Sequence, residues 1–418
     1  MGQTSFPDMF RAFGRIGLLS FGGPAAQIAL MHKELVEDRN WLSERDFLSA
    51  LSFCMLLPGP EAMQLATYSG WRLRGWLGGL LAGLLFVIPG AVIITALVLA
   101  YVQFGDLPLV QAMFLGVKAT VVVIVIQALR KLSAKALKSP AYWVIAALAF
   151  FAIFGFGLPF PLILILAAIA GVFLAEQSMP TEAAPISGSA RQTLLTVVFW
   201  GAIWLGPLLL LWASGATFLT DIAVFFAKLA VVTFGGAYAV LAYLAQAVVQ
   251  DHNWITAPEM IDALGLAETT PGPLILVTQF VAMLAGHHQG GVGLAMAAGI
   301  VALWMTFAPC FLWIFAGAPW IAALTHRPRI SAALSAITAA VVGVILNLTL
   351  WFAMHVWFAQ VTQVQTSLLT LTYPSLDSIS ITAVLLSVLA AGLMMGLRLG
   401  LAATLLIVAG VAGALALL

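Results

Sequence analysis

The chain has 418 residues, of which 63% are hydrophobic and 8% are charged, and its formal net charge is +1. So few charges cannot cover a water-soluble domain, in which roughly a quarter of the residues are charged. The near-neutral balance, with no basic stretch interleaved with aromatic residues, also excludes a nucleic-acid-binding surface.

Apolar stretches recur along the chain, and most reach or approach the roughly 20 residues that a helix needs to cross a bilayer. They are residues 77–103, 109–129, 141–157, 160–175, 195–213, 293–316, 331–357, 379–396 and 399–417. Helices are the predicted spanning structure, because open sheet edges are not tolerated in lipid and barrel strands are much shorter. The sequence therefore predicts an all-α, multi-pass integral protein of the inner (plasma) membrane.

An internal repeat is the most informative pattern. Adding 213 to the residue number aligns residues 13–60 with residues 226–273 without a gap. The matched motifs are Phe21-Gly22-Gly23 with Phe234-Gly235-Gly236, and Pro58-Gly59-Pro60 with Pro271-Gly272-Pro273. Because Gly and Pro are poor choices to repeat by chance in helix interiors, the match indicates a duplication.

A polar linker, residues 178–194, separates the two copies and is rich in Pro, Ser, Gly and Thr. It is followed by an apolar helix, residues 195–214, that has no counterpart before the first copy. One extra membrane crossing inverts the orientation of every helix that follows it. We therefore expect an N-terminal repeat (1–177) and a C-terminal repeat (215–418) of opposite orientation, forming one helical bundle, as in many transporters.

The distribution of Lys and Arg supports inversion, because short cytoplasmic loops are enriched in them. The first-half loops carry many cations, whereas the matching loops 245–259 and 286–292 contain none. If residues 10–31 and 47–70 each crossed fully, the loop 32–46 with its three Lys and Arg residues would be external. We therefore expect these two elements to be re-entrant or strongly broken.

Each of these elements is interrupted near its middle by Gly and Pro, which break helices. The breaks should lie near the bilayer midplane, since each remaining half spans about 16 Å of a ~30 Å core. A helix that begins after a break presents unpaired N–H groups and partial positive charge, which suits an anion. Four such starts would form an anion site; the alternative is that Gly and Pro serve only kinking or packing. The candidate binding residues are Gly22, Gly23, Pro24, Pro58, Gly59, Pro60, Gly235, Gly236, Pro271, Gly272 and Pro273.

Ionisable residues near or within the apolar segments are further candidates. Lys118 lies about 14 Å into its segment by helical rise, and is expected to pair with the anion or with a carboxylate. Arg15 and Lys228, at aligned positions, are predicted either to attract anions or to anchor at the interface. Glu61 follows the first Pro-Gly-Pro and is a candidate proton-coupling group, with helix capping as the alternative. Glu268, just before the second Pro-Gly-Pro, is a weaker candidate.

These motifs resemble those of the chromate ion transporter family, in its long two-domain form. The resemblance covers nearly the whole chain except the linker. It rests on residues 21–24, 38–41, 57–68 and 116–119 and on the second Phe-Gly-Gly and Pro-Gly-Pro. It implies transport of chromate, a tetrahedral dianion like sulfate, by efflux from the cytoplasm that confers chromate resistance. It also adds Gln64, within the most specific run, to the candidate binding residues.

The second half departs from the first at two positions, with Ala237 in place of Pro24 and Leu274 in place of Glu61. A role for Glu61 would therefore belong to the first half. The alternatives are a sulfate importer or other anion channel, and an intramembrane enzyme that acts on a phosphorylated lipid. The enzyme is disfavoured because the helix starts lack a cluster of catalytic carboxylates or histidines. No catalytic residue, cofactor or metal is expected; the expected partners are the oxyanion and the lipid bilayer, and the sequence is compatible with a homo-oligomer.

Overall fold

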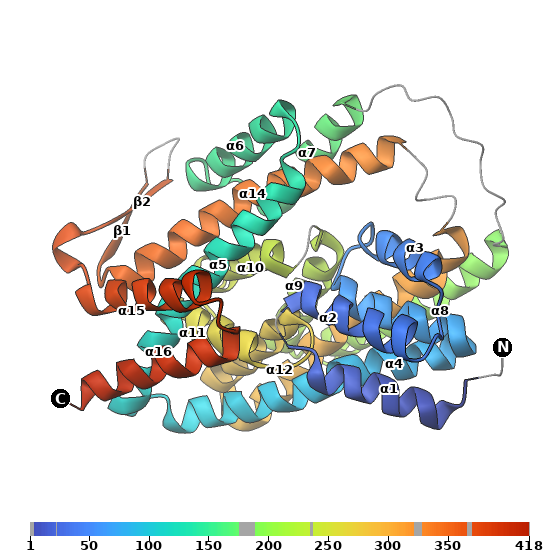
Figure 1. Ribbon diagram of the computed structural model, residues 1–418, viewed down its shortest axis with the longest axis horizontal. Helices are drawn as coiled ribbons and strands as arrows, with labels where there is room; N and C mark the ends of the chain where they lie inside the picture. Colours follow the sequence, from blue (N-terminus) through green and yellow to red (C-terminus); the bar gives the residue numbers. More distant parts are fainter. Residues whose placement is uncertain are drawn as a thin grey trace. The chain divides into compact units, whose positions relative to one another are not determined.

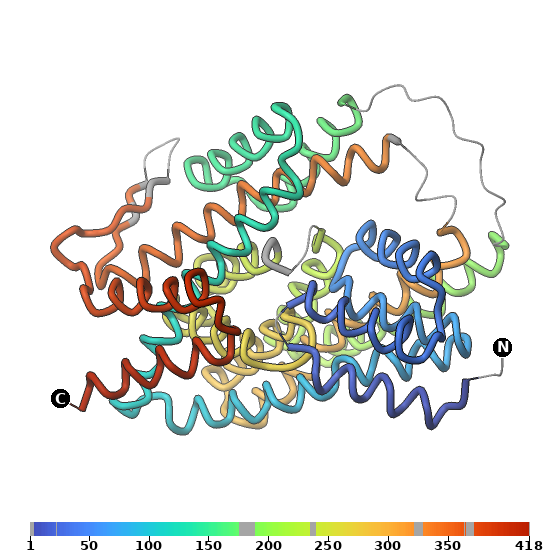
Figure 2. The backbone as a smooth tube through the Cα atoms, viewed as in Figure 1, coloured from blue at the N-terminus to red at the C-terminus, as the bar shows by residue number. Residues whose placement is uncertain are grey.

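The computed structural model is almost entirely helical (Figures 1 and 2). It describes residues 4–21, 23–174, 189–234, 237–321, 328–365 and 370–417. Within these ranges, five helical segments are long and apolar enough to cross a membrane. They are Glu61–Phe104, Pro108–Ala136, Ala190–Ala213, Leu274–Trp320 and Arg329–Trp357. The all-α membrane class predicted from composition is therefore confirmed.

The chain divides into two compact units, and each takes segments from both halves of the sequence. Unit 1 comprises Met1–Val98, Glu176–Val240 and Thr270–Ser331, and unit 2 comprises Leu99–Ala175, Leu241–Thr269 and Ala332–Leu418. Three helices, α4, α10 and α14, begin in unit 1 and end in unit 2.

Unit 1 contains the elements that surround the predicted breaks. They are α1 (Phe6–Leu19), α2 (Gly23–His32), the π-helix η1 (Lys33–Asp38), α3 (Glu44–Cys54), most of α4 (Glu61–Phe104), α8 (Ala190–Ala213), α9 (Thr217–Val232), the start of α10 (Ala237–Gln246), the 3-10 turns η3 (Leu274–Leu276) and η4 (Ala318–Trp320), and α12 (Val277–Gly317). Helix α12 packs against both α8 and α9.

Unit 2 is organised around α5, which packs against α11, α15 and α16. Its elements are the end of α4 and of α10, α5 (Pro108–Ala136), α6 (Pro140–Phe154), α7 (Phe160–Leu174), the π-helix η2 (Ala247–Asp251), α11 (Ala257–Thr269), α14 (Pro328–Trp357), β1 (Val361–Gln365), β2 (Thr370–Pro374), the 3-10 turn η5 (Leu376–Ser378), α15 (Ile381–Ala391), the π-helix η6 (Gly392–Gly396) and α16 (Leu401–Ala416). The two strands pair antiparallel, with Val361 opposite Pro374, and add a small hairpin to a fold expected to be all helix.

The element order of the first half recurs in the second. The series α1, α2, η1, α3, α4 corresponds to α9, α10, η2, α11 and the joined η3 and α12. The equivalent residues Asn40 and Asn253, which follow the two π-helices, share a φ of 51°. The duplication seen in the sequence therefore has a counterpart in local structure.

The first break returns the chain on itself. Helix α1 ends at Leu19 and α2 begins at Gly23, and Gly22 lies outside the described residues. Arg15 Nη1 lies 3.2 Å from Glu34 Oε1. Nineteen residues of continuous helix would separate these positions by roughly 28 Å, more than two side chains can bridge. The chain must therefore bend back between α1 and η1 (Figure 1).

A second reversal lies inside α4, where Gly75 has a φ of 63°. A Cβ atom added at Gly70 would overlap the carbonyl oxygen of Gly78, and one at Gly83 would overlap Thr67 Oγ1. Residues before the turn therefore pack against residues after it, as in two antiparallel helices. The glycines allow the backbones to approach this closely.

Helix α12 repeats this arrangement, with its turn at Gly290 and Gly291. A Cβ atom at Gly286 would meet the backbone of Leu294 and Ala295, and one at Gly299 would meet Met283. Each Pro-Gly-Pro is thus followed by a short helix that reverses into a longer, apolar one.

Adding a methyl group at Gly70 tests this packing. Gly70→Ala should lower the stability of the folded protein by about 1–3 kcal/mol, as other overpacked sites do. Thermal unfolding in detergent would report it as a lower Tm. Gly206→Ala in α8 is the matched control, because no heavy atom lies within 4 Å of a Cβ there and Ala favours the helix equally at both positions. Equal Tm values for the two variants would contradict the close helix packing.

Candidate anion-binding site

Two equivalent hydrogen bonds join the four breaks of unit 1. The Gly59 N–H donates to the Thr233 carbonyl oxygen at 2.8 Å, and the Gly272 N–H donates to the Ser20 carbonyl oxygen at 2.9 Å. Gly59 and Gly272 are related by the 213-residue offset, and so are Ser20 and Thr233. Each Pro-Gly-Pro loop is therefore bonded to the Phe-Gly-Gly break of the other half.

Glycine is required in both loops by the backbone conformation. Gly59 has a φ of 115° and Gly272 a φ of 91°, which side-chain-bearing residues rarely adopt. A Cβ atom at Gly59 would also lie 2.8 Å from Gln64 Nε2 and 3.1 Å from Cys310 Sγ. The duplicated Gly is thus fixed both by the turn and by its surroundings.

Buried glutamines hold the two Pro-Gly-Pro loops. Gln27 Nε2 donates to the Gly272 carbonyl oxygen at 2.7 Å, and Gln64 Nε2 donates to the Pro58 carbonyl oxygen at 2.6 Å. Both side chains are almost fully buried. Gln64 was predicted to belong to the site. Gln27 was not, although a glutamine inside an apolar segment was the available signal.

These glutamines also leave acceptor capacity unused. Within the described residues, Oε1 of Gln27, of Gln64 and of Gln279 is buried without a hydrogen-bond partner. Gln279 donates from Nε2 to the Ala91 carbonyl oxygen and to Thr95 Oγ1. Buried polar atoms of this kind are normally satisfied by ordered water or a ligand. The interior around the breaks is therefore polar, although it is enclosed by apolar helices.

A helical segment begins directly after each break: α2 at Gly23, α4 at Glu61, α10 at Ala237 and η3 at Leu274. The first N–H groups of an α-helix lack intrahelical partners and carry partial positive charge. The predicted site residues that unit 1 brings to these breaks are Gly23, Pro24, Pro58, Gly59, Pro60, Glu61, Gln64, Pro271, Gly272 and Pro273. Gly22, Gly235 and Gly236 lie outside the described residues.

Arg15, one of the two predicted anion-attracting cations, is engaged by a carboxylate. The buried Glu34 side chain lies between Arg15 and Arg39, each 3.2 Å from one of its oxygens. Arg15 remains 61% exposed and lines a surface groove along α1 together with Arg11. Lys228 is exposed on α9.

The polar loop after α2 is dense in acidic groups. His32 Nε2 lies 2.6 Å from Glu44 Oε2, and His32 Nδ1 lies 3.1 Å from Glu37 Oε1. The hydrogen bond to Glu44, with the negative charges of both glutamates, raises the pKa of His32 above its ordinary value. The carboxylates of residues 32–46 therefore outnumber the Lys and Arg residues of the same stretch.

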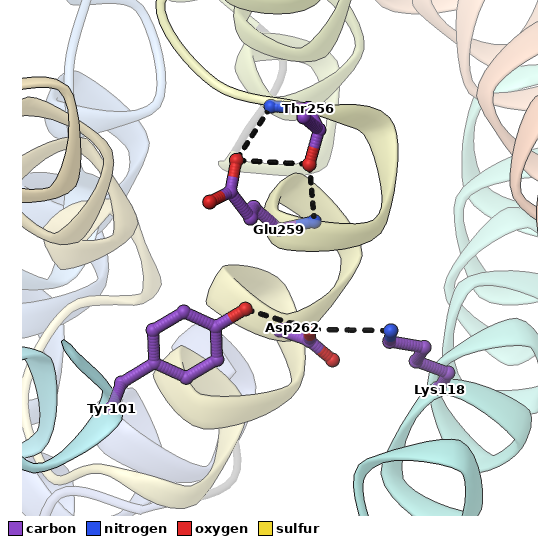
Figure 3. Close-up of polar contacts among 5 residues, drawn as sticks. All are labelled: Tyr101, Lys118, Thr256, Glu259 and Asp262. Carbon is purple, nitrogen blue, oxygen red and sulfur yellow. Dashed lines mark hydrogen bonds and ion pairs between the residues drawn. The ribbon is translucent and has the colours of Figure 1, made fainter. Parts of the chain in front are cut away.

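Lys118 belongs to unit 2, where its Nζ lies 3.2 Å from Asp262 Oδ2 (Figure 3). Of the two partners expected for Lys118, the structure gives it the carboxylate. Asp262 was missed, although an acidic residue inside an otherwise apolar helix was the signal that could have found it. Glu268, the weaker candidate, is buried in the last turn of α11. Among the described residues, no cluster of three or more His, Cys, Asp or Glu side chains is placed to hold a metal ion.

Removing the Gln27 amide tests how firmly the second loop is held. Gln27→Leu should destabilise the protein by about 1–3 kcal/mol, because the Gly272 carbonyl loses a buried hydrogen-bond donor. Thermal unfolding would measure the loss. Gln192→Leu, at an exposed position of α8, makes the same chemical change where no such bond is lost. Equal unfolding temperatures for the two variants would show that the Gln27 contact does not hold the loop.

Comparison with known proteins places these features in one family. The chromate transporter family matches residues 7–172 and 220–415. A chromate transport protein of Pseudomonas aeruginosa is 32% identical over 353 residues, which cover 82% of this chain and 79% of the relative. A probable chromate transport protein of Synechococcus elongatus is 31% identical over 355 residues, with 82% and 83% covered. No solved structure shows significant similarity to the chain. This multi-pass protein of the plasma membrane is a member of the chromate transporter family.

Proposed function

We propose that the chain transports chromate out of the cytoplasm and thereby confers chromate resistance. The observation that carries this proposal is the reciprocal bonding of the breaks, Gly59 to Thr233 and Gly272 to Ser20. It gathers the ends of four broken elements in one unit. The names of the relatives, which describe chromate transport, support the choice of substrate.

The anion is proposed to bind at the helix starts that follow the breaks. Backbone N–H groups and helix dipoles bind a dianion without a formal positive charge. The side-chain amides of Gln27 and Gln64 lie at the same loops. Their NH₂ groups hold the loops, and their unpaired Oε1 atoms can accept hydrogen bonds from the water around a hydrated anion. This chemistry fits a tetrahedral dianion, and sulfate is the alternative substrate.

Outward transport of a dianion is favoured by the membrane potential. Moving one elementary charge across 100 mV is worth about 2.3 kcal/mol. A doubly charged anion leaving a cell with a negative interior therefore gains about 4.6 kcal/mol per 100 mV. Efflux needs no nucleotide-binding domain to drive it.

The topology proposed for this function has two halves, residues 1–177 and 215–418, of opposite orientation. Helix α8, 24 residues long and apolar, is the extra crossing between them. The bend at the first break, which brings Arg15 beside Glu34, supports a re-entrant first element that reaches the midplane from one side. Access would alternate between the two membrane faces around a fixed site.

Flux through vesicles tests the function and the site together. Purified protein in sealed vesicles should move labelled chromate saturably, above the rate of protein-free vesicles. Gly272→Ala should reduce flux at least tenfold, because backbone strain of about 1–3 kcal/mol falls on a loop that is hydrogen-bonded at both its N–H and its carbonyl. Gly215→Ala is the matched control, since Gly215 has a φ of 73° and open space around it.

The outcomes separate the parts of the proposal. Absence of flux for both chromate and sulfate would contradict the proposal that the chain transports an oxyanion. Flux of sulfate but not of chromate would make sulfate the substrate. Equal flux of the Gly272 and Gly215 variants would move the binding site away from the breaks.

A further inference from the structure

A buried polar contact in unit 2 lies outside the breaks just described. Oδ2 of Asp262, on α11, accepts a hydrogen bond from the Tyr101 hydroxyl at 3.0 Å and forms an ion pair with Lys118 Nζ at 3.2 Å (Figure 3). Its side chain is 6% exposed, whereas that of Lys118 is 20% exposed. The lysine is thus the more exposed member of the ion pair.

The helices hold this contact closely. One turn after Asp262, a Cβ atom added at Gly265 would overlap Val117 Cγ1, next to Lys118 on α5. At the start of α11, Glu259 accepts hydrogen bonds from the Thr256 N–H and hydroxyl (Figure 3). Tight packing and a fixed helix start therefore set the position of the carboxylate relative to the lysine.

Asp262 is only half satisfied in this position. Its second oxygen, Oδ1, is buried without a hydrogen-bond partner among the described residues. Burying a carboxylate costs free energy, which the lysine and the tyrosine offset at Oδ2 alone. A proton on Oδ1 would remove the negative charge without disturbing the Tyr101 contact.

We propose that Asp262 is a proton-binding group of the carrier, and that its protonation releases Lys118 to bind an oxyanion at a second site, in unit 2, separate from the site proposed at the breaks. The inference rests on the proposed function. In the resting state the charges of Lys118 and Asp262 cancel. Uptake of one proton by the carboxylate leaves the ammonium group as the free charge, so a proton and a dianion bind unit 2 together.

Charge balance explains why the two binding events support each other. With Asp262 ionised, an added dianion would bring the contact to a net charge of about −2, which is costly away from water. With Asp262 protonated, the net charge is about −1. Because linkage is reciprocal, the anion must then raise the proton affinity of Asp262 by the same factor as the proton raises anion affinity.

The charged and titratable groups facing Asp262 are Lys118 from α5, Tyr101 from α4 and Glu259 from its own helix. The contact has no copy in the other repeat. Ser49 aligns with Asp262 at the 213-residue offset, and Ile337 aligns with Lys118 at an offset of 219, which matches the region around residue 119. Among the described residues no equivalent contact lies at the aligned positions, so one proton is expected for each anion bound at Lys118. If the two leave the cell together, they carry one net negative charge instead of two.

The test measures anion binding and proton uptake together. Wild-type protein in detergent should bind chromate and sulfate more tightly as the pH falls, by up to about tenfold per pH unit for one linked proton. Anion binding at Lys118 should take up about one proton per anion, and a pH indicator would measure this uptake. The Asp262→Asn variant should bind these anions with an affinity that lacks the wild-type increase at low pH. Anion binding to this variant should take up no proton. Comparing the two proteins at each pH cancels any titration of the anion itself.

Two controls separate this role from a structural one. Asp377→Asn in η5 makes the same chemical change at an exposed carboxylate outside this contact and should keep the wild-type pH profile. Tyr101→Phe removes one hydrogen bond to Oδ2 and should move the midpoint of the profile to higher pH by about one to two units. This milder variant keeps the test decisive if Asp262→Asn fails to fold.

Wild-type proton uptake in Asp262→Asn, or an unchanged midpoint in Tyr101→Phe, would overturn the inference. If Glu61→Gln abolished proton uptake instead, the proton site would belong to the first Pro-Gly-Pro. These outcomes differ from failure of the proposed function, in which wild-type protein would bind and move neither anion.

Discussion

The fold depends on the pairing of backbone groups that broken helices leave open inside an apolar environment. Hydrocarbon offers no hydrogen bonds, so irregular backbone in an apolar environment must form its hydrogen bonds with protein groups or with water in a hydrated cavity. The chain meets this constraint with the Gly59–Thr233 and Gly272–Ser20 bonds and with the Gln27 and Gln64 amides. The glycine-mediated reversals in α4 and α12 then pack apolar helices around the same loops.

Much of this arrangement was predictable from the sequence, because helix breaking is a local property. The breaks at Gly23 and Pro60 follow from residue type, and the 213-residue repeat identified their copies. The exchange of bonds between the halves was not predictable, because it depends on tertiary packing of segments more than 200 residues apart. Asp262 was missed for a related reason. Its partners Lys118 and Tyr101 lie more than 140 residues away in sequence, and no spacing rule connects them.

The two units use different electrostatics. At the breaks of unit 1, partial charges of helix ends and amides dominate, and the nearby Arg15 is already engaged by Glu34. In unit 2, a full positive charge on Lys118 is held by one carboxylate. The repeat supplies the helix ends in duplicate, whereas the glutamine amides and the Lys118–Asp262 pair arise from residues without counterparts. A duplicated scaffold thus carries an ionisable pair that is not duplicated.

The exchanged hydrogen bonds also mean that neither half completes its own breaks. A polypeptide carrying the first half alone would leave the Gly59 N–H and the Ser20 carbonyl without these partners, each at a cost of about 1–3 kcal/mol when buried. The second half alone would leave the Thr233 carbonyl and the Gly272 N–H without their hydrogen-bond partners. Separately encoded halves would therefore have to assemble with each other to pair these groups.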